Sequence, residues 1–255
     1  MDPVAPPSEG LQSLARGLAV IEALAAADEP MTLARVAQSA GLNRAVTRRV
    51  LLTLVDVGYV LAHGRDFTLR PRVLELGEAY RASLRLPALA VGPMQDLTRS
   101  TGRSSALGVL DGADVVHVER VAAGRIVDAV PDIGTRLPAR TSALGRVLLA
   151  ALPEDALRDV LRGGVSAPSA EDDDDGKLVA TLAGVRAQGH CVVAEELQRG
   201  LTSVAAPVRD ATGRVVAAVE LALTTVTLPD GCVPEEDVAA VRAAAEAISA
   251  AAAGL

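Results

Sequence analysis

The sequence predicts an α+β protein of two unlike domains: a small N-terminal helical module with a β-hairpin, and a larger C-terminal domain with an antiparallel sheet. Apolar residues recur at helical spacing up to about residue 57, whereas alternating and β-branched runs are frequent after residue 105. Residues 1–85 hold 10 arginines and 9 acidic residues, but residues 86–255 hold 15 basic and 23 acidic residues. With 255 residues, 50% of them hydrophobic, the chain can fill two cores of common domain size.

The N-terminal module is expected to begin with three helices. Apolar residues at helical spacing over Leu11–Leu24 predict a first helix of about four turns, which Pro30 ends. Thr32 is placed to cap a short second helix. Gly41 then supplies a left-handed turn before a third helix over Asn43–Val57.

A β-hairpin is expected to complete this module. Gly58 stops the third helix, and the runs Tyr59–Leu61 and Phe67–Leu69 predict two short strands joined across "AHGRD". Helix, tight turn, helix and hairpin together predict a winged helix-turn-helix domain over residues 11–72. Residues 1–10 are expected to form a disordered arm.

Positive charge is concentrated on this module. Within residues 32–72 seven arginines outnumber two acidic residues, although the formal net charge of the chain is −7. Because the start of the recognition helix meets base edges in such motifs, we expect Arg44 and Arg48 to reach bases and Arg49 and Arg65 to contact phosphates. The alternative is a solvated helix face that happens to be rich in arginine. The predicted interface with double-stranded DNA consists of Thr32, Asn43, Arg44, Ala45, Val46, Arg48, Arg49 and Arg65.

The C-terminal half is expected to form one sheet with helices packed on it. Strands joined in pairs across the turns "DGAD" and "DATGR" are expected at Ser105–Leu110, Val115–Val121, Val204–Val208 and Val215–Leu223. Helices are expected at Pro87–Thr101, Ser142–Leu152, Pro153–Leu161, Lys177–Gln188 and Pro234–Ala253. The run "SAPSAEDDDDG" from Ser166 predicts a solvated loop rather than a metal site.

Several stretches, in the same order along the chain, resemble the isocitrate lyase regulator (IclR) family of bacterial transcription factors. The resemblance implies a winged helix over 11–72, a linker helix over 73–86, and an effector-binding and oligomerisation domain over 87–255 related to GAF folds. It also implies binding to near-palindromic operators as a homodimer or a dimer of dimers. The stretches are "QSLARGLAVIEALA" from Gln12, Leu33–Val60, "RVLELGEAY" from Arg72, "GTRLPARTSALGRVLLAAL" from Gly134, and Val185–Ala222.

The segment "GTRLPARTSALGR" is the expected effector contact. Thr141 or Ser142 can cap the helix that begins there, and the free amides of Ala143 and Leu144 offer hydrogen-bond donors to a carboxylate. An ordinary capped helix without a ligand is the alternative. By the resemblance, the positions that line the family's pocket fall on Ala129, Leu137, Ala143, Leu144, Val193, Leu201, Ser203, Glu220 and Ala222.

Glu220 differs from the other expected pocket residues because it can carry a negative charge. Facing an anionic ligand, its carboxylate would need a hydroxyl partner, a shared proton or a nearby arginine such as Arg140. The segment "GTRLPARTSALGR" most resembles members that regulate aromatic-acid degradation through the β-ketoadipate route. A benzoate-type or β-ketoadipate-type acid is therefore the expected effector, with short keto acids as the alternative ligand. A GAF-like protein that senses a non-acid metabolite is the alternative function.

Catalysis, a cofactor and a metal site are not expected. The motifs G-x-S-x-G and H-E-x-x-H and the phosphate-binding P-loop are absent from the sequence. His190 and Cys191 are neighbours in an expected strand and so point to opposite faces, which places the imidazole poorly for activating the thiol. No other metal-ligating residues stand at a suitable spacing from His63 or His117 in the sequence. No apolar run approaches the roughly 20 residues of a membrane span, and the separated cysteines suit a reducing cytoplasm.

Overall fold

The computed structural model describes residues 10–124, 131–163, 173–228 and 232–253. The chain divides into two compact units, Met1–Tyr80 and Arg81–Leu255, and each unit is described by itself. Three expectations lie partly or wholly outside the described residues: the N-terminal arm over 1–10, the pocket position Ala129, and the loop that begins at Ser166.

The N-terminal unit contains the three expected helices. They are α1 (Gln12–Ala25), α2 (Leu33–Ser39) and α3 (Arg44–Asp56). The Thr32 hydroxyl caps α2 by accepting a hydrogen bond from the Arg35 amide at 3.4 Å. Gly41 has a φ of 64° and makes the left-handed turn between α2 and α3. The apolar faces of the helices enclose one core around the fully buried Val20, Val36 and Leu51.

The hairpin is present, with a shorter turn than expected. Strand β2 (Val60–His63) pairs with β3 (Asp66–Leu69), so both strands extend into the "AHGRD" segment and only Gly64 and Arg65 remain between them. A two-residue strand that the sequence pattern missed, β1 (Met31–Thr32), adds to β3. Arg72 secures the base of the hairpin by donating to the Val57 carbonyl at 2.6 Å and lying over the Tyr59 ring. This arginine therefore has a structural role.

Two consecutive helices follow the hairpin. A short 3₁₀ turn (Pro71–Val73) leads into α4 (Leu74–Leu84), which buries none of its residues. Arg85 has a φ of 53° and breaks the helical path before α5 (Leu86–Thr101) begins. The boundary between the two units falls within α4, after Tyr80.

The C-terminal unit is built on one antiparallel sheet of six strands in the order β6-β5-β4-β9-β8-β7. The two expected hairpins, β4–β5 and β8–β9, are both confirmed. The edge strand β6 was not recognised in the sequence because its three residues are too few to show an alternating pattern. The strands are β4 (Ser105–Asp111), β5 (Asp114–Val121), β6 (Arg136–Pro138), β7 (Cys191–Ala194), β8 (Leu201–Arg209) and β9 (Val215–Thr224).

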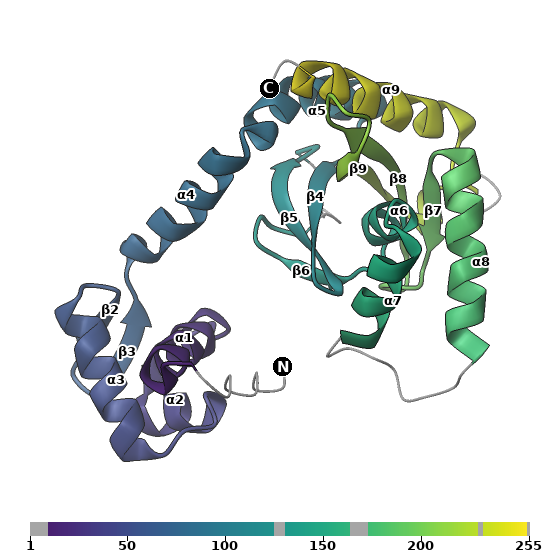
Figure 1. Cartoon of the computed structure of the whole chain (residues 1–255). Helices are drawn as coiled ribbons and strands as arrows, with labels where there is room; N and C mark the ends of the chain where they lie inside the picture. Colours follow the sequence, from purple (N-terminus) through teal and green to yellow (C-terminus); the bar gives the residue numbers. More distant parts are fainter. Residues whose placement is uncertain (1–9, 125–130, 164–172, 229–231, 254–255) are drawn as a thin grey trace. The chain divides into compact units, whose positions relative to one another are not determined.

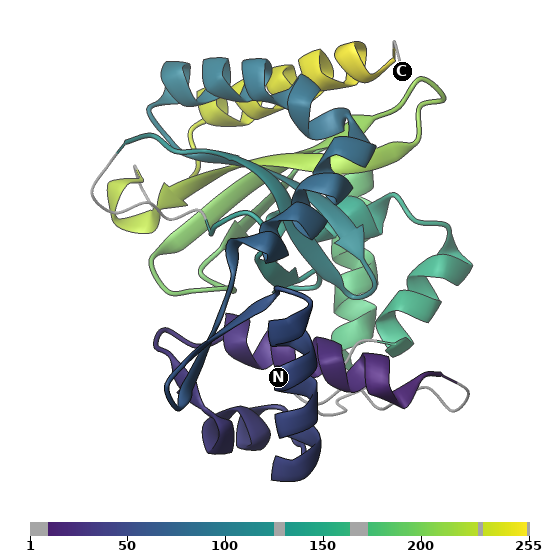
Figure 2. The ribbon, with the colours of Figure 1, turned by 90° about the vertical axis from the view of Figure 1, so that its left-hand side faces the viewer.

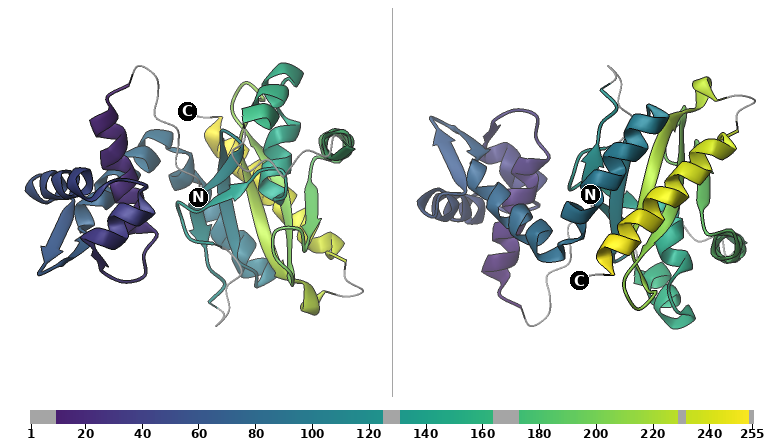
Figure 3. Two further views of the ribbon diagram at one scale, coloured as in Figure 1. Left: turned by 90° about the horizontal axis from the view of Figure 1, so that it is seen from below. Right: turned by 90° about the horizontal axis from the view of Figure 1, so that it is seen from above.

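Helices cover both faces of this sheet (Figures 1 and 2). On one face α5 and α9 lie side by side, as the view from above shows (Figure 3), and bury Met94, Val241 and Ile248 against the sheet. On the other face α6 and α8 bury Leu144 and Leu182 in a second core. The helices after α5 are α6 (Ala143–Ala150), α7 (Glu154–Gly163), α8 (Asp173–Gln188) and α9 (Glu235–Ala252).

The start of α8 corrects one expectation. The acidic run from Asp173 was assigned to a solvated loop, but helix α8 already begins at Asp173. Acidic residues are favourable in a first helical turn because they complement the partial positive charge of the helix N-terminus. This preference explains how an acidic run can belong to a helix.

Candidate nucleic-acid interface and effector cavity

The start of α3 is fixed by its cap. The Asn43 side chain accepts a hydrogen bond from the Val46 amide at 2.9 Å, and the Thr47 hydroxyl donates to the Asn43 carbonyl at 3.0 Å. Thr47 is fully buried, whereas Arg44 and Ala45 are exposed. The inward Thr47 therefore turns the first residues of α3 outward.

The arginines of the predicted DNA interface present free charge. Arg44, Arg48 and Arg49 on α3 and Arg65 in the hairpin turn are exposed, and none forms an ion pair with a residue that the structure describes. Of the other predicted contacts, Val46 is half-buried and Thr32 already serves as the cap of α2. The charges are thus available to phosphates and base edges.

A second site lies on the face of the sheet that α6 covers. Ser142, rather than Thr141, caps α6, because its hydroxyl accepts a hydrogen bond from the Gly145 amide at 3.1 Å. The amides of Ala143 and Leu144 have no hydrogen-bond partner among the described residues. They provide two donors at the positive end of the helix dipole.

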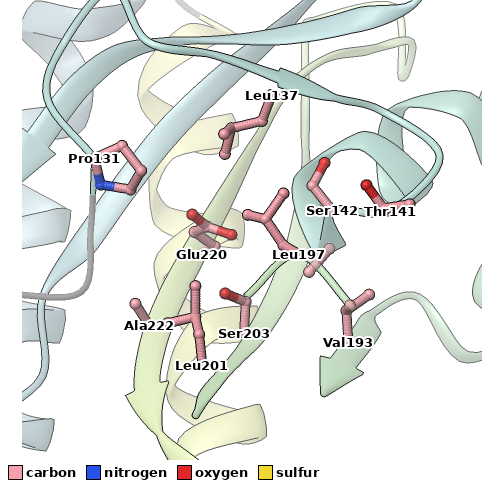
Figure 4. A pocket seen from close by; sticks show the side chains of 11 residues that line it. Pro131, Leu137, Thr141, Ser142, Val193, Leu197, Leu201, Ser203, Glu220 and Ala222 are labelled. Atoms are coloured by element: carbon pink, nitrogen blue, oxygen red, sulfur yellow. The ribbon is translucent and has the colours of Figure 1, made fainter. Parts of the chain in front are cut away.

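A small cavity opens beside this helix start (Figure 4). Its volume is about 20 Å³, enough for a single water molecule. Figure 4 shows the Glu220 carboxyl and the Ser203 hydroxyl on the strands, with the Ser142 and Thr141 hydroxyls at the helix start. The cavity is lined by Pro131, Leu137, Thr141, Ser142, Ala143, Val193, Leu197, Leu201, Ser203, Glu220 and Ala222.

Most of the positions transferred from the family resemblance lie together at this cavity. Leu144 is an exception: it is fully buried in the core, with its side chain against Gly108, and only its amide is at the helix start. The sequence reasoning missed Leu197, whose only signal was being the one apolar residue in the polar turn Glu195–Gly200. It also missed the lining role of Pro131. The transferred positions at the cavity are Leu137, Ala143, Val193, Leu201, Ser203, Glu220 and Ala222.

The turn that carries Leu197 is tied to α6. Arg146 on α6 donates to both carboxylate oxygens of Glu196, at 2.8 and 2.5 Å, and to the Arg140 carbonyl at 2.8 Å. Glu195, at the start of the turn, has a φ of 60°, which is unusual for a residue other than glycine. This bidentate ion pair holds Leu197 at the cavity.

Glu220 is the ionisable residue of the cavity lining, and most of the residues around it are apolar. Its Oε1 lies 3.8 Å from Nε2 of His117, which is fully buried. Burial raises the pKa of Glu220 to about 8. Burial also lowers the pKa of His117, partly offset by a hydrogen bond to the Pro131 carbonyl and reinforced by the charge of Arg120. The titratable group that Glu220 approaches is thus an imidazole, and not the guanidinium of Arg140.

A larger open hollow of about 1270 Å³ lies between α6, α7, α8 and the ends of β4, β8 and β9. Its lining is mostly apolar, and three of its four arginines have side-chain partners within the described part of the chain, Arg214 being the exception. Arg158 pairs with Glu154 at 2.8 Å, Arg186 donates to the Ala150 carbonyl, and Arg209 donates to the Gly213 carbonyl. No set of unpaired polar groups converges there among the described residues, so the smaller cavity is the better candidate for a ligand site.

Metal ligation and membrane insertion find no support in the described parts of the chain. No group of three or more His, Cys, Asp or Glu side chains there could hold a metal ion. The longest helices in those parts are too short or too polar to cross a bilayer.

Comparison with known proteins extends over both units. Residues 13–63 match the model of the IclR helix-turn-helix domain, and residues 78–250 match the model of the bacterial transcriptional regulator IclR C-terminal domain. The chain is 37% identical over 214 residues to the Pca regulon regulatory protein of Pseudomonas putida, covering 83% of this chain and 74% of that protein.

Two further relatives agree with this assignment. The p-hydroxybenzoate hydroxylase transcriptional activator of Acinetobacter baylyi is 31% identical over 215 residues, covering 82% of this chain and 79% of that protein. The crystal structure of a Rhodococcus sp. RHA1 protein, itself assigned only provisionally as a transcriptional regulator, is 42% identical. It has a TM-score of 0.81 and covers 96% of this chain and 99% of that chain. The chain belongs to the IclR family of bacterial transcriptional regulators.

Proposed function

We propose that this regulator binds its DNA operator through α3 and the hairpin turn, and that a small carboxylic acid in the α6 cavity controls this binding. The single observation that carries the choice of an acid is the pair of unpartnered amides at Ala143 and Leu144, beside the cavity. Backbone donors at a helix start favour an anion because they add hydrogen bonds to the helix dipole.

The apolar lining supports a compact hydrophobic body on this acid. Leu137, Leu197 and Leu201 supply aliphatic walls, and Ser203 can add a hydroxyl contact. The relatives named above, regulators of a Pca regulon and of p-hydroxybenzoate hydroxylase, support the same aromatic-pathway chemistry. A benzoate-type or β-ketoadipate-type acid is therefore the proposed effector class.

Such an acid needs more room than the cavity provides, because common ligand pockets exceed about 300 Å³. Of the lining residues outside the strands and helices, Leu197 has the largest side chain, so rotating this side chain would open the most space while the Arg146–Glu196 ion pair keeps its turn in place. Displacing its side chain would join the helix start to the space around Glu220 and Ser203. We therefore propose that the acid replaces Leu197 in the cavity.

A ligand screen tests the proposed function directly. The purified full chain is heated with benzoate, 4-hydroxybenzoate, β-ketoadipate, pyruvate or a neutral analogue such as benzamide, and the shift in melting temperature is recorded. An aromatic or β-ketoadipate-type acid should raise the melting temperature and change operator affinity, whereas benzamide should do neither. Stabilisation by the neutral analogue alone would contradict an acid effector and favour a sensor of a non-acid metabolite.

Substituting the arginines of α3 should separate base readout from phosphate contact. Arg44→Ala or Arg48→Ala is expected to cost about 1–3 kcal/mol on the operator and to relax its sequence preference, because each side chain is proposed to bond a base edge. Arg49→Ala and Arg65→Ala should weaken operator and random duplex alike, because phosphates are the same in every sequence. Fluorescence anisotropy with both duplexes measures the two affinities.

The matched control for these substitutions is Arg35→Ala, an exposed arginine on α2 outside the proposed contacts. It should leave operator preference unchanged. Equal losses on operator and random duplex for all four substitutions would remove the proposed division of roles. A binding constant insensitive to salt would argue against phosphate contacts altogether.

Dimer formation is proposed to involve two exposed apolar stripes of the N-terminal unit. Leu14 on α1 is 61% exposed and Leu76 on α4 is 56% exposed, which is unfavourable unless another copy of the chain covers them. Leu14→Asp or Leu76→Asp should shift the full chain toward monomer in analytical ultracentrifugation and weaken operator binding by at least about tenfold. Val179→Asp, at an exposed apolar residue of α8, is the control and should change neither property. A dimer undiminished by both substitutions would refute these stripes as the interface.

A further inference from the structure

A buried carboxyl and a buried imidazole approach each other beneath the effector cavity. Glu220 on β9 and His117 on β5 are separated by β4, where the opposing residues are Ala106 and Gly108. These small residues leave space for the two long side chains to meet across the intervening strand. Nε2 of His117 is fully buried and has no hydrogen-bond partner among the described residues. The nearest acidic oxygen to it, Oε1 of Glu220, is 3.8 Å away.

The arginines on the surrounding elements form ion pairs with acidic residues other than Glu220. Arg120 on β5 pairs with Asp132 at 3.0 Å, and Arg146 on α6 pairs with Glu196. Arg136 on β6 pairs with Asp111 at 2.6 Å and with Asp114. The residues opposite Glu220 on β4 and β8 are Ala106 and Ala205.

The remaining charged groups around this face also leave Glu220 without a compensating charge. Glu119 on β5 pairs with Arg81 at 2.5 Å, and Glu195 in the β7–β8 turn accepts from the Gly200 amide. Arg140, before α6, forms no ion pair with Glu220, and burial alone shifts the pKa of Glu220. An ionised Glu220 would therefore be a buried charge facing only an imidazole, which is strongly unfavourable.

The contacts of His117 also indicate which of its ring nitrogens carries a proton. Nδ1 of His117 lies 3.4 Å from the Pro131 carbonyl, an acceptor that favours a proton on Nδ1. Nε2 is then unprotonated, and Glu220 is the acidic residue close to its lone pair. Oε1 of Glu220 lies 3.8 Å from this nitrogen, so a proton on the carboxyl can face an acceptor there without forming a hydrogen bond to it. Both groups remain neutral near pH 7, in agreement with the raised pKa of Glu220 and the lowered pKa of His117.

We propose that Glu220 is a specificity-determining residue that binds the effector's carboxylate as a protonated acid, and that this carboxyl keeps its proton, facing Nε2 of His117, when the cavity is empty. This inference rests on the proposed function, because it assumes that the effector is an acid. The protonated carboxyl donates a hydrogen bond to the anion from the sheet side, while the Ala143 and Leu144 amides donate from the helix side. An ionised Glu220 repels the same anion, so the acid binds only the form of the pair that holds a proton.

The first test follows Glu220 in the full chain without any ligand. Infrared difference spectra between the wild type and Glu220→Gln should show a protonated carboxyl band at about pH 7 that disappears by about pH 10. Glu119→Gln is the matched control, because Glu119 is also buried but has Arg81 as a partner. A Glu220 carboxyl that is already ionised at about pH 7 would overturn the proposal regardless of which ligand binds.

The second test measures binding of benzoate by calorimetry in buffers from about pH 6 to about pH 10. In the wild type the affinity should be flat below about pH 8 and then fall roughly tenfold per pH unit, because one proton is linked to binding. Glu220→Gln should bind within about threefold of the wild type at pH 7 and lose this pH dependence, because its neutral amide also donates a hydrogen bond. Glu119→Gln should keep the dependence.

The outcomes separate this inference from the proposed function. Benzoate, 4-hydroxybenzoate or β-ketoadipate binding with a pH-independent constant would overturn the role of Glu220 alone. A different result would be that the Glu220→Gln protein binds benzoate normally but loses most of its affinity for 4-hydroxybenzoate. Glu220 would then be an acceptor for the ligand's hydroxyl group, and the proposal would be wrong. Failure of every acid to bind at any pH would overturn the acid effector itself, and the role of Glu220 with it.

Discussion

Replacing Gly145 by alanine is expected to destabilise the C-terminal unit by about 3 kcal/mol or more, the upper end of the usual cost of overpacking a core. A Cβ atom at Gly145 would lie 2.6 Å from the Ala139 carbonyl carbon and would overlap the Cα and oxygen of Ala139. These are backbone atoms of a fully buried residue, so no side-chain rotation can relieve the clash. Helix α6 would have to move away from the segment that precedes it.

Thermal unfolding of the full chain measures this effect. A loss of about 3 kcal/mol should lower the melting temperature of the C-terminal unit by about 6–12 °C. Gly184→Ala is the matched control, because Gly184 is also helical but has no atom within 4 Å of the added Cβ. That substitution should be neutral or stabilising by up to about 1 kcal/mol, since alanine favours helix. A Gly145→Ala protein that melts with the wild type would contradict the close contact between α6 and Ala139.

Replacing Ala143 by aspartate is expected to abolish the response to an acid effector. Ala143 is fully buried at the first position of α6 and lines the cavity, so the new carboxylate would occupy the place proposed for that of the ligand. Acid binding should weaken by at least about 100-fold, because two negative charges would share one buried site. Operator affinity without ligand should be retained, because the DNA contacts lie on α3 and the hairpin turn.

Ala143→Asn separates charge from size in this experiment. Asparagine has nearly the volume of aspartate but no charge, so any loss that it causes reports crowding of the small cavity. Calorimetry with benzoate compares the two variants, and circular dichroism confirms that each is folded. If Ala143→Asn reduces acid binding as much as Ala143→Asp, the charge argument and the proposed carboxylate position at the helix start are both wrong.

Much of the local structure could be predicted because its signals lie close together in the sequence. Asn43 and Thr32 are caps that bond to amides only three residues away, so sequence spacing alone identified both helix starts. The turns "DGAD" and "DATGR" likewise join strands that pair with their immediate neighbours in the chain. In contrast, β1 and β6 have only two and three residues, and the residues that pair with them lie 20 or more positions away in the chain.

The cavity was predictable only in part. The helix start at Ala143 and the hydroxyl of Ser203 could be assigned through the family resemblance, because each occupies a recognisable motif. Leu144 was assigned to the same pocket, but helical geometry turns adjacent residues by about 100° and directs its side chain into the core. Leu197 was missed because the Arg146–Glu196 ion pair, which joins residues 50 positions apart, holds its turn at the cavity.

The sequence by itself determined the family, the helix-turn-helix with its arginine-rich third helix, and the two long hairpins β4–β5 and β8–β9. These properties depend on periodicity, capping and turn chemistry, which act over a few residues. Only the tertiary structure decided that Glu220 meets His117 rather than an arginine. That pairing depends on strand order, on Ala106 and Gly108 between the two side chains, and on burial, because the proton affinity of a carboxyl is set by the groups that surround it in space.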